Sequence, residues 1–582
     1  MIEDLTPQLL SVAMLLVIAL ATTLTFTVSA LILWLYRRRV RLAMAASASA
    51  PLPAGSAARG EQHAAADASP SFAPPRVDST GARAGREPTA FRSALRAPWL
   101  AAARMAGAGL AFAGVTALAE MLAFPGLRTL PWFAAIVWIA SWPAVLGLGV
   151  TAPGGARLWA FAISGYVVPL LLYVLAAVLQ PGDAALLGAD LFELRDGLTP
   201  PRLLRIWLLV NGAPTLLLLL FLNPWLRAVG PLVLAFMTIV ATGLVVFGLT
   251  LMTRSGRDFG VWLTKVSGWL PSRTIPRVTV LVVLAFAALA WRFAYLIRRG
   301  YVQKRSNDRS LILDAVWLLF AMYYAMWFAL IGVAWVAAGL LAFAAYKLAG
   351  AAARSLADAP ATRDGLIFLR VFALGRRSDA LLDALGRHWR HIGSMHLITG
   401  PDVAASTVQP HQMLDFLSGR LASHFVRDAA SLERRLREHD TEPDRDGLFR
   451  VNNFFCHAYT WEAACARLVL EGHAVLMDLR SFSSSNAGCV HELRHLLHRV
   501  PLARCVLVVD DSTDGDFLQR TLAEALRDID AESPNRGVRL GDIAAHRYDG
   551  RRGALRALLE RLCVASRAAQ PGFTARPAIS IS

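Results

Sequence analysis

Cysteine is scarce in this 582-residue chain, and none occurs before Cys456. The five cysteines are not paired at the spacing of a metal site, so a cysteine-based metal centre is not expected. Unpaired cysteines confined to one region are typical of a reduced compartment and argue against an oxidising one. We therefore expect the C-terminal third of the chain to be cytoplasmic.

Charged residues are also few, at 17% of the chain, whereas 55% of residues are hydrophobic. Long uncharged runs in the first 350 residues explain this balance and are typical of an integral membrane protein, so the lipid bilayer is an expected partner. The net charge of +17 comes from Arg-rich loops between the apolar runs. An anionic membrane surface explains such loops, and without an aromatic-basic module no nucleic acid is expected as a partner.

The first long apolar run, Leu9–Tyr36, is followed at once by basic residues from Arg37 to Arg41. By the positive-inside rule, residues 1–41 form an N-terminal transmembrane anchor whose C-terminal end is cytoplasmic. Residues 42–98 are rich in Ala, Ser, Pro, Gly and Arg and have few large apolar side chains. We expect them to form a disordered cytoplasmic linker.

Residues 99–350 are predicted to form a multi-span transmembrane domain. The stretch Leu311–Leu348 is too long for one crossing, so we expect a tight hairpin and nine spans in all. The basic segment Phe259–Leu270 is expected to lie along the membrane interface. This organisation predicts a multi-pass protein of a bacterial inner membrane with a cytoplasmic C-terminal domain. The other expected spans are Met105–Phe124, Pro131–Val150, Leu158–Gln180, Leu203–Leu222, Gly230–Met252 and Val278–Ile297.

Four polar residues interrupt these spans, namely Glu120, Asn211, Arg292 and Asp314. Ionisable groups inside a membrane are candidates for function. Each of these lies near a predicted helix end or stands alone, so we attribute them to helix packing or snorkelling.

Residues 351–567 have the alternating strands and helices of an α/β domain, and residues 568–582 are expected to be a disordered tail. The fold class predicted for the whole chain is an α-helical polytopic membrane domain followed by a doubly wound, parallel-sheet α/β domain. Within the second domain, the highly charged segment Leu432–Asp446 is expected to be a solvated insert.

The stretch Ala474–Asp511 is the most informative part of the α/β domain. It reads as strand, small-residue loop, helix and strand, with Asp478 ending the first strand and Asp510 following the second. Open α/β sheets bind ligands at the carboxyl ends of their strands. Asp478 and Asp510 are therefore candidates to contact a ribose, or alternatively cap the next helix.

A second candidate element begins the first helix of the domain. Arg376, Arg377 and Ser378 follow the first strand, where backbone N–H groups and a cation hold phosphate in many proteins. The alternative is a helix cap formed by Ser378 or Asp379 with two solvated arginines.

Glu492 lies about one helical turn beyond the small-residue loop. A carboxylate there can stabilise or attack an oxocarbenium-like centre when an N-glycosidic bond breaks. The alternative is a solvated helix glutamate paired with His495.

The segment from Asn486 to Leu493 reads NAGCVHEL and resembles the Ser-x-Trp-Cys-x-x-Glu-Leu segment of Toll/interleukin-1-receptor (TIR) domains. It is also similar to the Asp-x-Gly-Thr-x-x-Glu segment of nucleoside 2-deoxyribosyltransferases. The resemblance implies a flavodoxin-like sheet, Glu492 as the catalytic carboxylate, and Cys489 at the TIR cysteine. It places Ser485 and Asn486 in the ligand-binding loop.

Taken whole, the chain resembles bacterial multi-span membrane proteins that end in such a domain. NAD or another nucleotide is the ligand that the resemblance implies, with self-association through the domain. It implies a signalling or defence effector that cleaves NAD or a related N-glycoside. A non-catalytic signalling or interaction module remains the alternative.

The letters HELRH from His491 to His495 also fit the zinc-peptidase pattern H-E-x-x-H. Two histidines four residues apart share a helix face and can hold zinc, with the glutamate activating water. A membrane-tethered zinc peptidase is therefore a third hypothesis. The motif opens a crossover helix in a doubly wound sheet, so we predict no metal ligands here.

Overall fold

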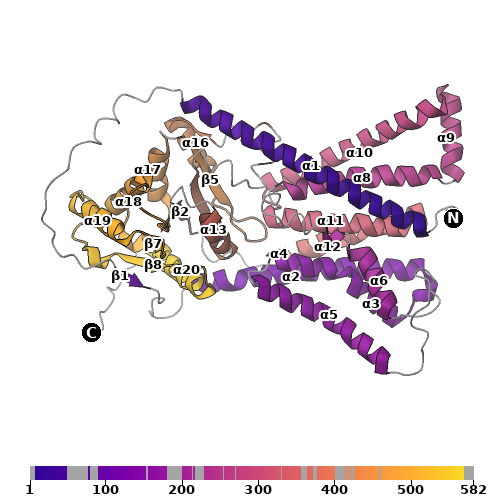
Figure 1. Ribbon diagram of the computed structural model, residues 1–582, viewed down its shortest axis with the longest axis horizontal. Helices are drawn as coiled ribbons and strands as arrows, with labels where there is room; N and C mark the ends of the chain where they lie inside the picture. Colours follow the sequence, from indigo (N-terminus) through magenta and orange to yellow (C-terminus); the bar gives the residue numbers. More distant parts are fainter. Residues whose placement is uncertain are drawn as a thin grey trace. The chain divides into compact units, whose positions relative to one another are not determined.

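The computed structural model divides the chain into two compact units, each described by itself (Figure 1). The helical unit comprises residues 1–34, 99–357 and 409–413, and the sheet unit comprises the rest. The residues that the structure describes are 7–48, 76–78, 89–151, 155–179, 200–212, 214–216, 229–252, 254–268, 270–329, 331–355, 364–370, 376–399, 413, 416, 419, 421, 425–457 and 460–568. The predicted tail 568–582 lies almost entirely outside them.

The helical unit contains long apolar helices. Five stretches among the described residues are long and apolar enough to cross a membrane: Ala90–Ala123, Leu130–Leu148, Ser272–Val302, Arg309–Phe328 and Val336–Ser355. The helices are α1 (Pro7–Ala48), α2 (Thr89–Ala123), α3 (Leu130–Ala140), α4 (Trp142–Thr151), α5 (Gly155–Leu179), α6 (Pro200–Trp207), α8 (Gly230–Met252), α9 (Arg254–Ser267), α10 (Pro271–Val302), α11 (Asp308–Ala329) and α12 (Val336–Ser355).

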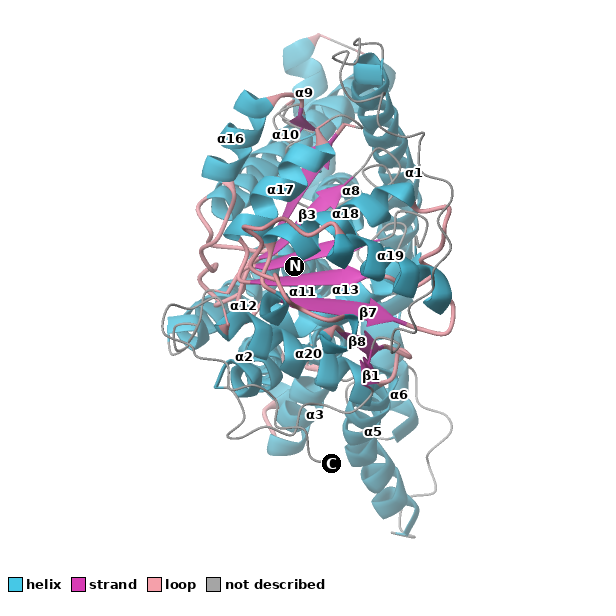
Figure 2. Ribbon diagram, turned by 90° about the vertical axis from the view of Figure 1, so that its left-hand side faces the viewer, coloured by secondary structure: helices cyan, strands magenta, loops and turns pink. Residues whose placement is uncertain are grey.

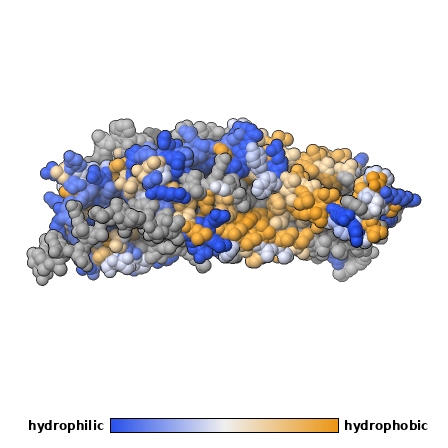
Figure 3. Space-filling model, turned by 90° about the horizontal axis from the view of Figure 1, so that it is seen from above, coloured by the Kyte–Doolittle hydropathy of each residue, from blue (hydrophilic) through white to orange (hydrophobic). Residues whose placement is uncertain are grey.

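Apolar side chains cover much of the surface of the helical unit (Figure 3). Helix α10 exposes Leu281, Leu284 and Trp291, each at least 58% accessible. Exposed apolar surface of this extent is typical of a helix that faces lipid. These helices identify a membrane protein, whereas the count of nine spans stays a prediction.

The predicted hairpin over Leu311–Leu348 is confirmed as two helices, α11 and α12. They pack closely because Gly339 has no side chain: a Cβ there would lie 2.4 Å from the carbonyl oxygen of Ala321. The rings of Trp317 and Tyr346 stack between the two helices, with centroids 4.9 Å apart. The pairing of Asp314 with Lys347, at 2.5 Å, gives this polar residue a packing role.

The structure bears on three other expectations for the helical unit. The expected span Pro131–Val150 is two helices, α3 and α4, separated by a turn at Ser141. Asn211 donates from Nδ2 to the carbonyl oxygen of Ile139 at 3.0 Å, in agreement with a packing role. Helix α9 leaves Phe259 and Trp262 half exposed, which suits a helix lying along an interface.

The described residues of the sheet unit form an eight-stranded sheet in the order β1-β8-β7-β6-β2-β3-β5-β4, and every neighbouring pair is parallel. Its helices are α13 (Arg376–Trp389), α16 (Ala429–Glu438), α17 (Trp461–Glu471), α18 (Ala487–Arg499), α19 (Gly515–Arg527) and α20 (Arg552–Arg567). The strands are β1 (Arg76–Asp78), β2 (Leu366–Arg370), β3 (Met395–Thr399), β4 (Phe425–Val426), β5 (Val451–Cys456), β6 (Ala474–Asp478), β7 (Cys505–Val509) and β8 (Ala544–Arg547).

Helices cover both faces of this sheet (Figure 2). Alternate side chains of β2 point to opposite faces: Ile367 and Leu369 pack among α16, α17, α18 and α19, whereas Leu366 and Phe368 pack against α13 and α20. All four side chains are fully buried or nearly so. The predicted doubly wound parallel sheet is therefore confirmed.

Two segments differ from the sequence-based expectation. Part of the expected linker is ordered, because Arg76–Asp78 pairs with β8 and Phe91, at the start of α2, is buried against α20. The remainder of residues 49–88 lies outside the described residues. The expected solvated insert contains α16, whose Leu432 and Leu436 are buried in the core. The five charged residues of α16 obscured this apolar pair in the sequence.

The chain reverses its direction of winding between β2 and β6. It runs from β2 outward to β3 and to the edge strand β4, comes back to β5, and then crosses to β6 and continues to β7 and β8 on the other side. The carboxyl ends of β2 and β6 therefore form the topological switch point, where doubly wound sheets hold their ligands.

Candidate functional site

Asp478, the last residue of β6, is the centre of a buried network at this switch point. Its carboxylate accepts hydrogen bonds from Arg480 Nε and Nη2 and from Ser378 Oγ, each at 2.7 Å. Asp478 and Ser378 are fully buried, and Arg480 is 5% exposed. Because these donors surround its carboxylate, Asp478 joins the start of α13 to the loop after β6 and has a structural role there.

Arg377 makes a second, more exposed cluster beside the first. Its Nη2 pairs with Asp510 after β7, and its Nη1 reaches the hydroxyls of Ser481 and Ser512 at 3.4 and 3.3 Å. The Arg377 side chain is 53% exposed, so this guanidinium faces solvent at the mouth of the switch point. Asp510 Oδ1 also accepts the backbone N–H of Ser512 at 3.0 Å, which fixes the loop after β7.

The start of α13 differs from the capping arrangement considered from the sequence. The helix begins at Arg376, so Ser378 and Asp379 lie inside it and do not cap it. Asp379 instead pairs with Arg370 at the end of β2, at 2.9 Å. The side chain of Arg376 lies outside the described residues.

Ser485 and Asn486 lie in the loop between β6 and α18. Asn486 Oδ1 accepts the backbone N–H of Ser483 at 2.8 Å, and Ser485 Oγ is 2.9 Å from Ser483 Oγ. These bonds hold the loop in shape, and Ser485 remains exposed. The structure thus brings Arg377, Ser378, Asp478 and Asp510 together, with Ser485 and Asn486 in the loop that follows Asp478.

Glu492 is buried, at 2% exposed, which contradicts both the solvated position and the pairing with His495. It lies on α18, and its Oε2 atom has no hydrogen-bond partner among the described residues. Burial raises its carboxyl pKa to about 8. The thiol pKa of Cys465 on α17 is raised mainly by burial and, to a smaller extent, by the neighbouring Glu492. Glu492 is therefore protonated at neutral pH, in the helical layer next to α17.

The two histidines of the HELRH motif have different surroundings. The His491 ring packs edge-on against Trp461, with centroids 5.6 Å apart, whereas burial lowers the pKa of His495. In the part of the chain that the structure describes, no group of three metal-ligating side chains is placed to hold an ion. A zinc site at this motif would lack its third ligand.

Three participants at the switch point were not predicted from the sequence, namely Arg480, Ser481 and Ser512. Arg480 and Ser512 each lie two residues after an aspartate that ends or follows a strand, at Asp478 and Asp510. That spacing lets a side chain fold back on the carboxylate and is the signal that could have identified these two residues.

Comparison with known proteins identifies no relative: no protein-family model matches the chain, and neither does any curated protein or solved structure.

Proposed function

We propose that this protein is a multi-pass protein of a bacterial inner membrane whose cytoplasmic sheet unit binds a nucleotide as a signalling module. The main observation in support of this proposal is the half-exposed Arg377, which is held at the switch point by Asp510 and two serine hydroxyls. The helical unit then serves as the membrane anchor, and self-association through the sheet unit would bring modules together.

The chemistry of the switch point suits a phosphate-bearing ligand. Arg377 lies in the first turn of α13, where the helix dipole favours an anion and the guanidinium adds a planar set of donors. Its bonds to Ser481 and Ser512 are long, so a phosphate oxygen can replace them at little cost. The exposed Ser485 hydroxyl is a further donor in the adjacent loop.

Arg377→Ala is expected to weaken binding of NAD or ADP-ribose by about tenfold or more, since a bidentate charged contact is lost. Titration calorimetry on the full chain in detergent micelles measures this change. Arg387→Ala, in the last turn of the same helix, removes the same charge far from the switch point and serves as the control. Equal affinities for both variants and the wild type would exclude Arg377 from the site.

A second candidate function is cleavage of the N-glycosidic bond of NAD, with Glu492 as the carboxylate. The observation that favours it is a buried acid with a raised pKa and an unpartnered oxygen, a combination frequent in active sites. Because only the ionised form stabilises an oxocarbenium-like centre, such cleavage would speed up as the pH rises towards 8.

The proposed orientation in the membrane predicts three reporter results. Fusions after Gln303 and after Ser582 are expected to report the cytoplasm, because Arg298, Arg299 and Lys304 place the α10–α11 connection inside. A fusion at Gly332, between α11 and α12, is expected to report the periplasm. A periplasmic signal after Ser582 would contradict the proposal, since a nucleotide ligand is cytoplasmic.

A further inference from the structure

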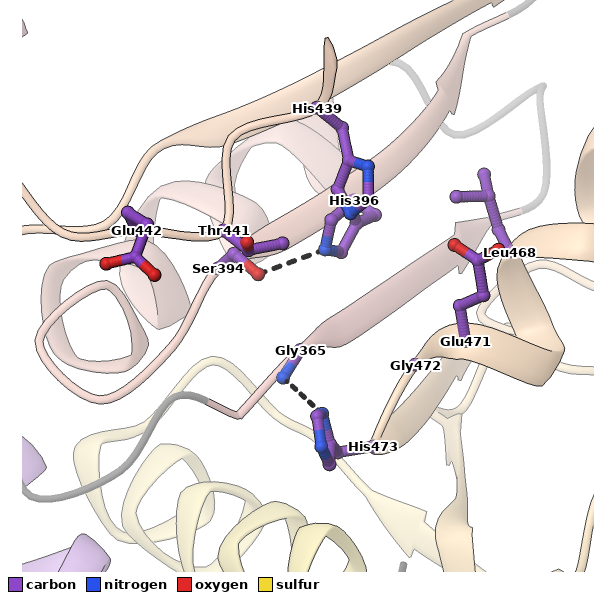
Figure 4. Close-up of a pocket in the computed structure, with 10 residues that line it drawn as sticks. All are labelled: Gly365, Ser394, His396, His439, Thr441, Glu442, Leu468, Glu471, Gly472 and His473. Atoms are coloured by element: carbon purple, nitrogen blue, oxygen red, sulfur yellow. Dashed lines mark hydrogen bonds between the residues drawn. The ribbon is translucent and has the colours of Figure 1, made fainter. Parts of the chain in front are cut away.

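A cavity lies at the opposite edge of the sheet, where β2, β3 and β6 begin (Figure 4). Its volume is about 280 Å³. Gly365, Ser394 and His473 precede these three strands, and the other walls come from α17 and from the loop after α16. The lining residues are Gly365, Ser394, His396, His439, Thr441, Glu442, Leu468, Glu471, Gly472 and His473. We call this cavity the amino-edge pocket.

Three imidazoles, those of His396, His439 and His473, line the amino-edge pocket. His396 is 5% exposed, its Nε2 is 3.0 Å from Ser394 Oγ, and its Nδ1 has no partner among the described residues. The His439 ring lies 5.2 Å from it, and its Nδ1 contacts the carbonyl oxygen of Leu436. A carbonyl only accepts, so His439 Nδ1 carries a proton at this contact.

Burial, with smaller contributions from His439 and His473, lowers the pKa of His396 to about 3. His396 is therefore neutral at physiological pH and keeps an acceptor nitrogen. A buried nitrogen without a hydrogen-bond partner destabilises the folded protein, unless a bound group donates a hydrogen bond to it.

Two carboxylates stand at the rim of the amino-edge pocket. Glu442, from the loop after α16, and Glu471, from the end of α17, lie on either side of the histidines in Figure 4. Both are exposed, and Arg467 lies 3.7 Å from Glu471. No Lys or Arg is among the lining residues, whereas two carboxylates are, and this balance favours a cation over an anion.

We propose that the amino-edge pocket binds a small organic cation, namely a primary ammonium compound. Its ammonium donates hydrogen bonds to imidazole nitrogen and is stabilised by Glu442 and Glu471, while Leu468 packs against its carbon chain. No metal-binding group is formed by the described residues, so an inorganic cation is disfavoured. This site is separate from the switch point, which lies at the other end of β2 and β6.

Gly365 provides a sharp test of the amino-edge pocket. A Cβ added there would lie 3.5 Å from His473 Nδ1 and 3.7 Å from His396 Nε2, which is ordinary contact distance. Gly365→Ala therefore occupies space inside the pocket without displacing the backbone. Glu442→Gln removes one rim charge at an exposed position and keeps the size of the side chain.

The experiment titrates propylammonium into the full chain in detergent micelles, with propanol and propionate as neutral and anionic probes of the same length. We expect saturable binding of propylammonium, and binding at least about tenfold weaker for the other two probes. Gly365→Ala and Glu442→Gln should each weaken propylammonium binding by about threefold to tenfold at an unchanged melting temperature. Absence of saturable propylammonium binding, equal binding of propionate, or wild-type affinity in Gly365→Ala would overturn the proposal. Tighter binding of Zn²⁺ than of propylammonium would do so as well.

Discussion

Asp478→Ala is expected to lower the free energy of unfolding of the sheet unit by about 3–5 kcal/mol, because it leaves a buried guanidinium without its counter-charge. Arg480 is 5% exposed and donates two of its hydrogen bonds to Asp478. The Ser378 hydroxyl loses its acceptor at the same time. Chemical denaturation of the full chain in micelles, followed by hydrogen exchange in β6 and α13, measures the loss.

Two further variants test whether the loss of stability in Asp478→Ala comes from the unpaired buried charge. Asp511→Ala removes the acceptor of Arg547, whose side chain is 51% exposed, so its cost should be smaller than that of Asp478→Ala. The double substitution Asp478→Leu and Arg480→Met removes both charges and should recover most of the stability. If Asp478→Ala costs no more than Asp511→Ala, the network does not stabilise the unit.

The strands of the sheet unit were largely predictable, whereas one of its helices was not. Met395–Thr399 and Cys505–Val509 are short apolar runs bounded by polar residues, and the structure forms strands over the same residues. Helix α16 was missed because only Leu432 and Leu436 mark its buried face among many charges. Two apolar positions four residues apart carry too little signal to distinguish a packed helix from a loop.

The candidate site was predictable in position but not in detail. The carboxyl ends of parallel strands share one edge, so grouping Arg377, Asp478 and Asp510 required only the strand order. Which carboxylate is buried depends on the partner helix, and no local pattern contains that information. For the same reason the sequence left a solvated position open for Glu492, whereas its side chain is buried near Cys465 of α17.

The amino-edge pocket could not be found from the sequence at all. His396, His439 and His473 belong to three separate segments and share no motif. They meet because β3 and β6 flank β2 while α16 ends above β3. Only the sheet order brings these residues together.

Glu492→Gln is expected to remove a large pH dependence of stability. The carboxyl pKa rises from 4.5 to about 8 on folding, so between these values the folded state holds a proton that the unfolded state has lost. Rising pH therefore favours unfolding by about 1.4 kcal/mol per unit, or roughly 5 kcal/mol in total, and the loss is complete above pH 8. Glutamine has no proton to lose, so the variant should be the more stable protein at pH 8.

The difference between Glu492→Gln and the wild type isolates this residue from other titrating groups. His396 acts in the opposite direction, because burial lowers its pKa and its contribution to stability is lost as the pH falls below 6.5. That contribution is common to both proteins and cancels in the difference. Denaturation midpoints at pH 5, 6.5 and 8 supply the comparison, and a constant difference across this range would contradict the raised pKa.

The same variant decides between a catalytic and a purely binding sheet unit. If Glu492 is the carboxylate of an N-glycosidase, Glu492→Gln should lower nicotinamide release from NAD by orders of magnitude at pH 8, where the variant is also the more stable protein. Leu493→Ala is the matched control, because this neighbour is fully buried and its truncation should cost about 2–5 kcal/mol. That substitution should lower activity only as far as it unfolds the unit. Wild-type cleavage by Glu492→Gln would exclude the residue from catalysis, and a wild-type protein that binds NAD without releasing nicotinamide would be a signalling module alone.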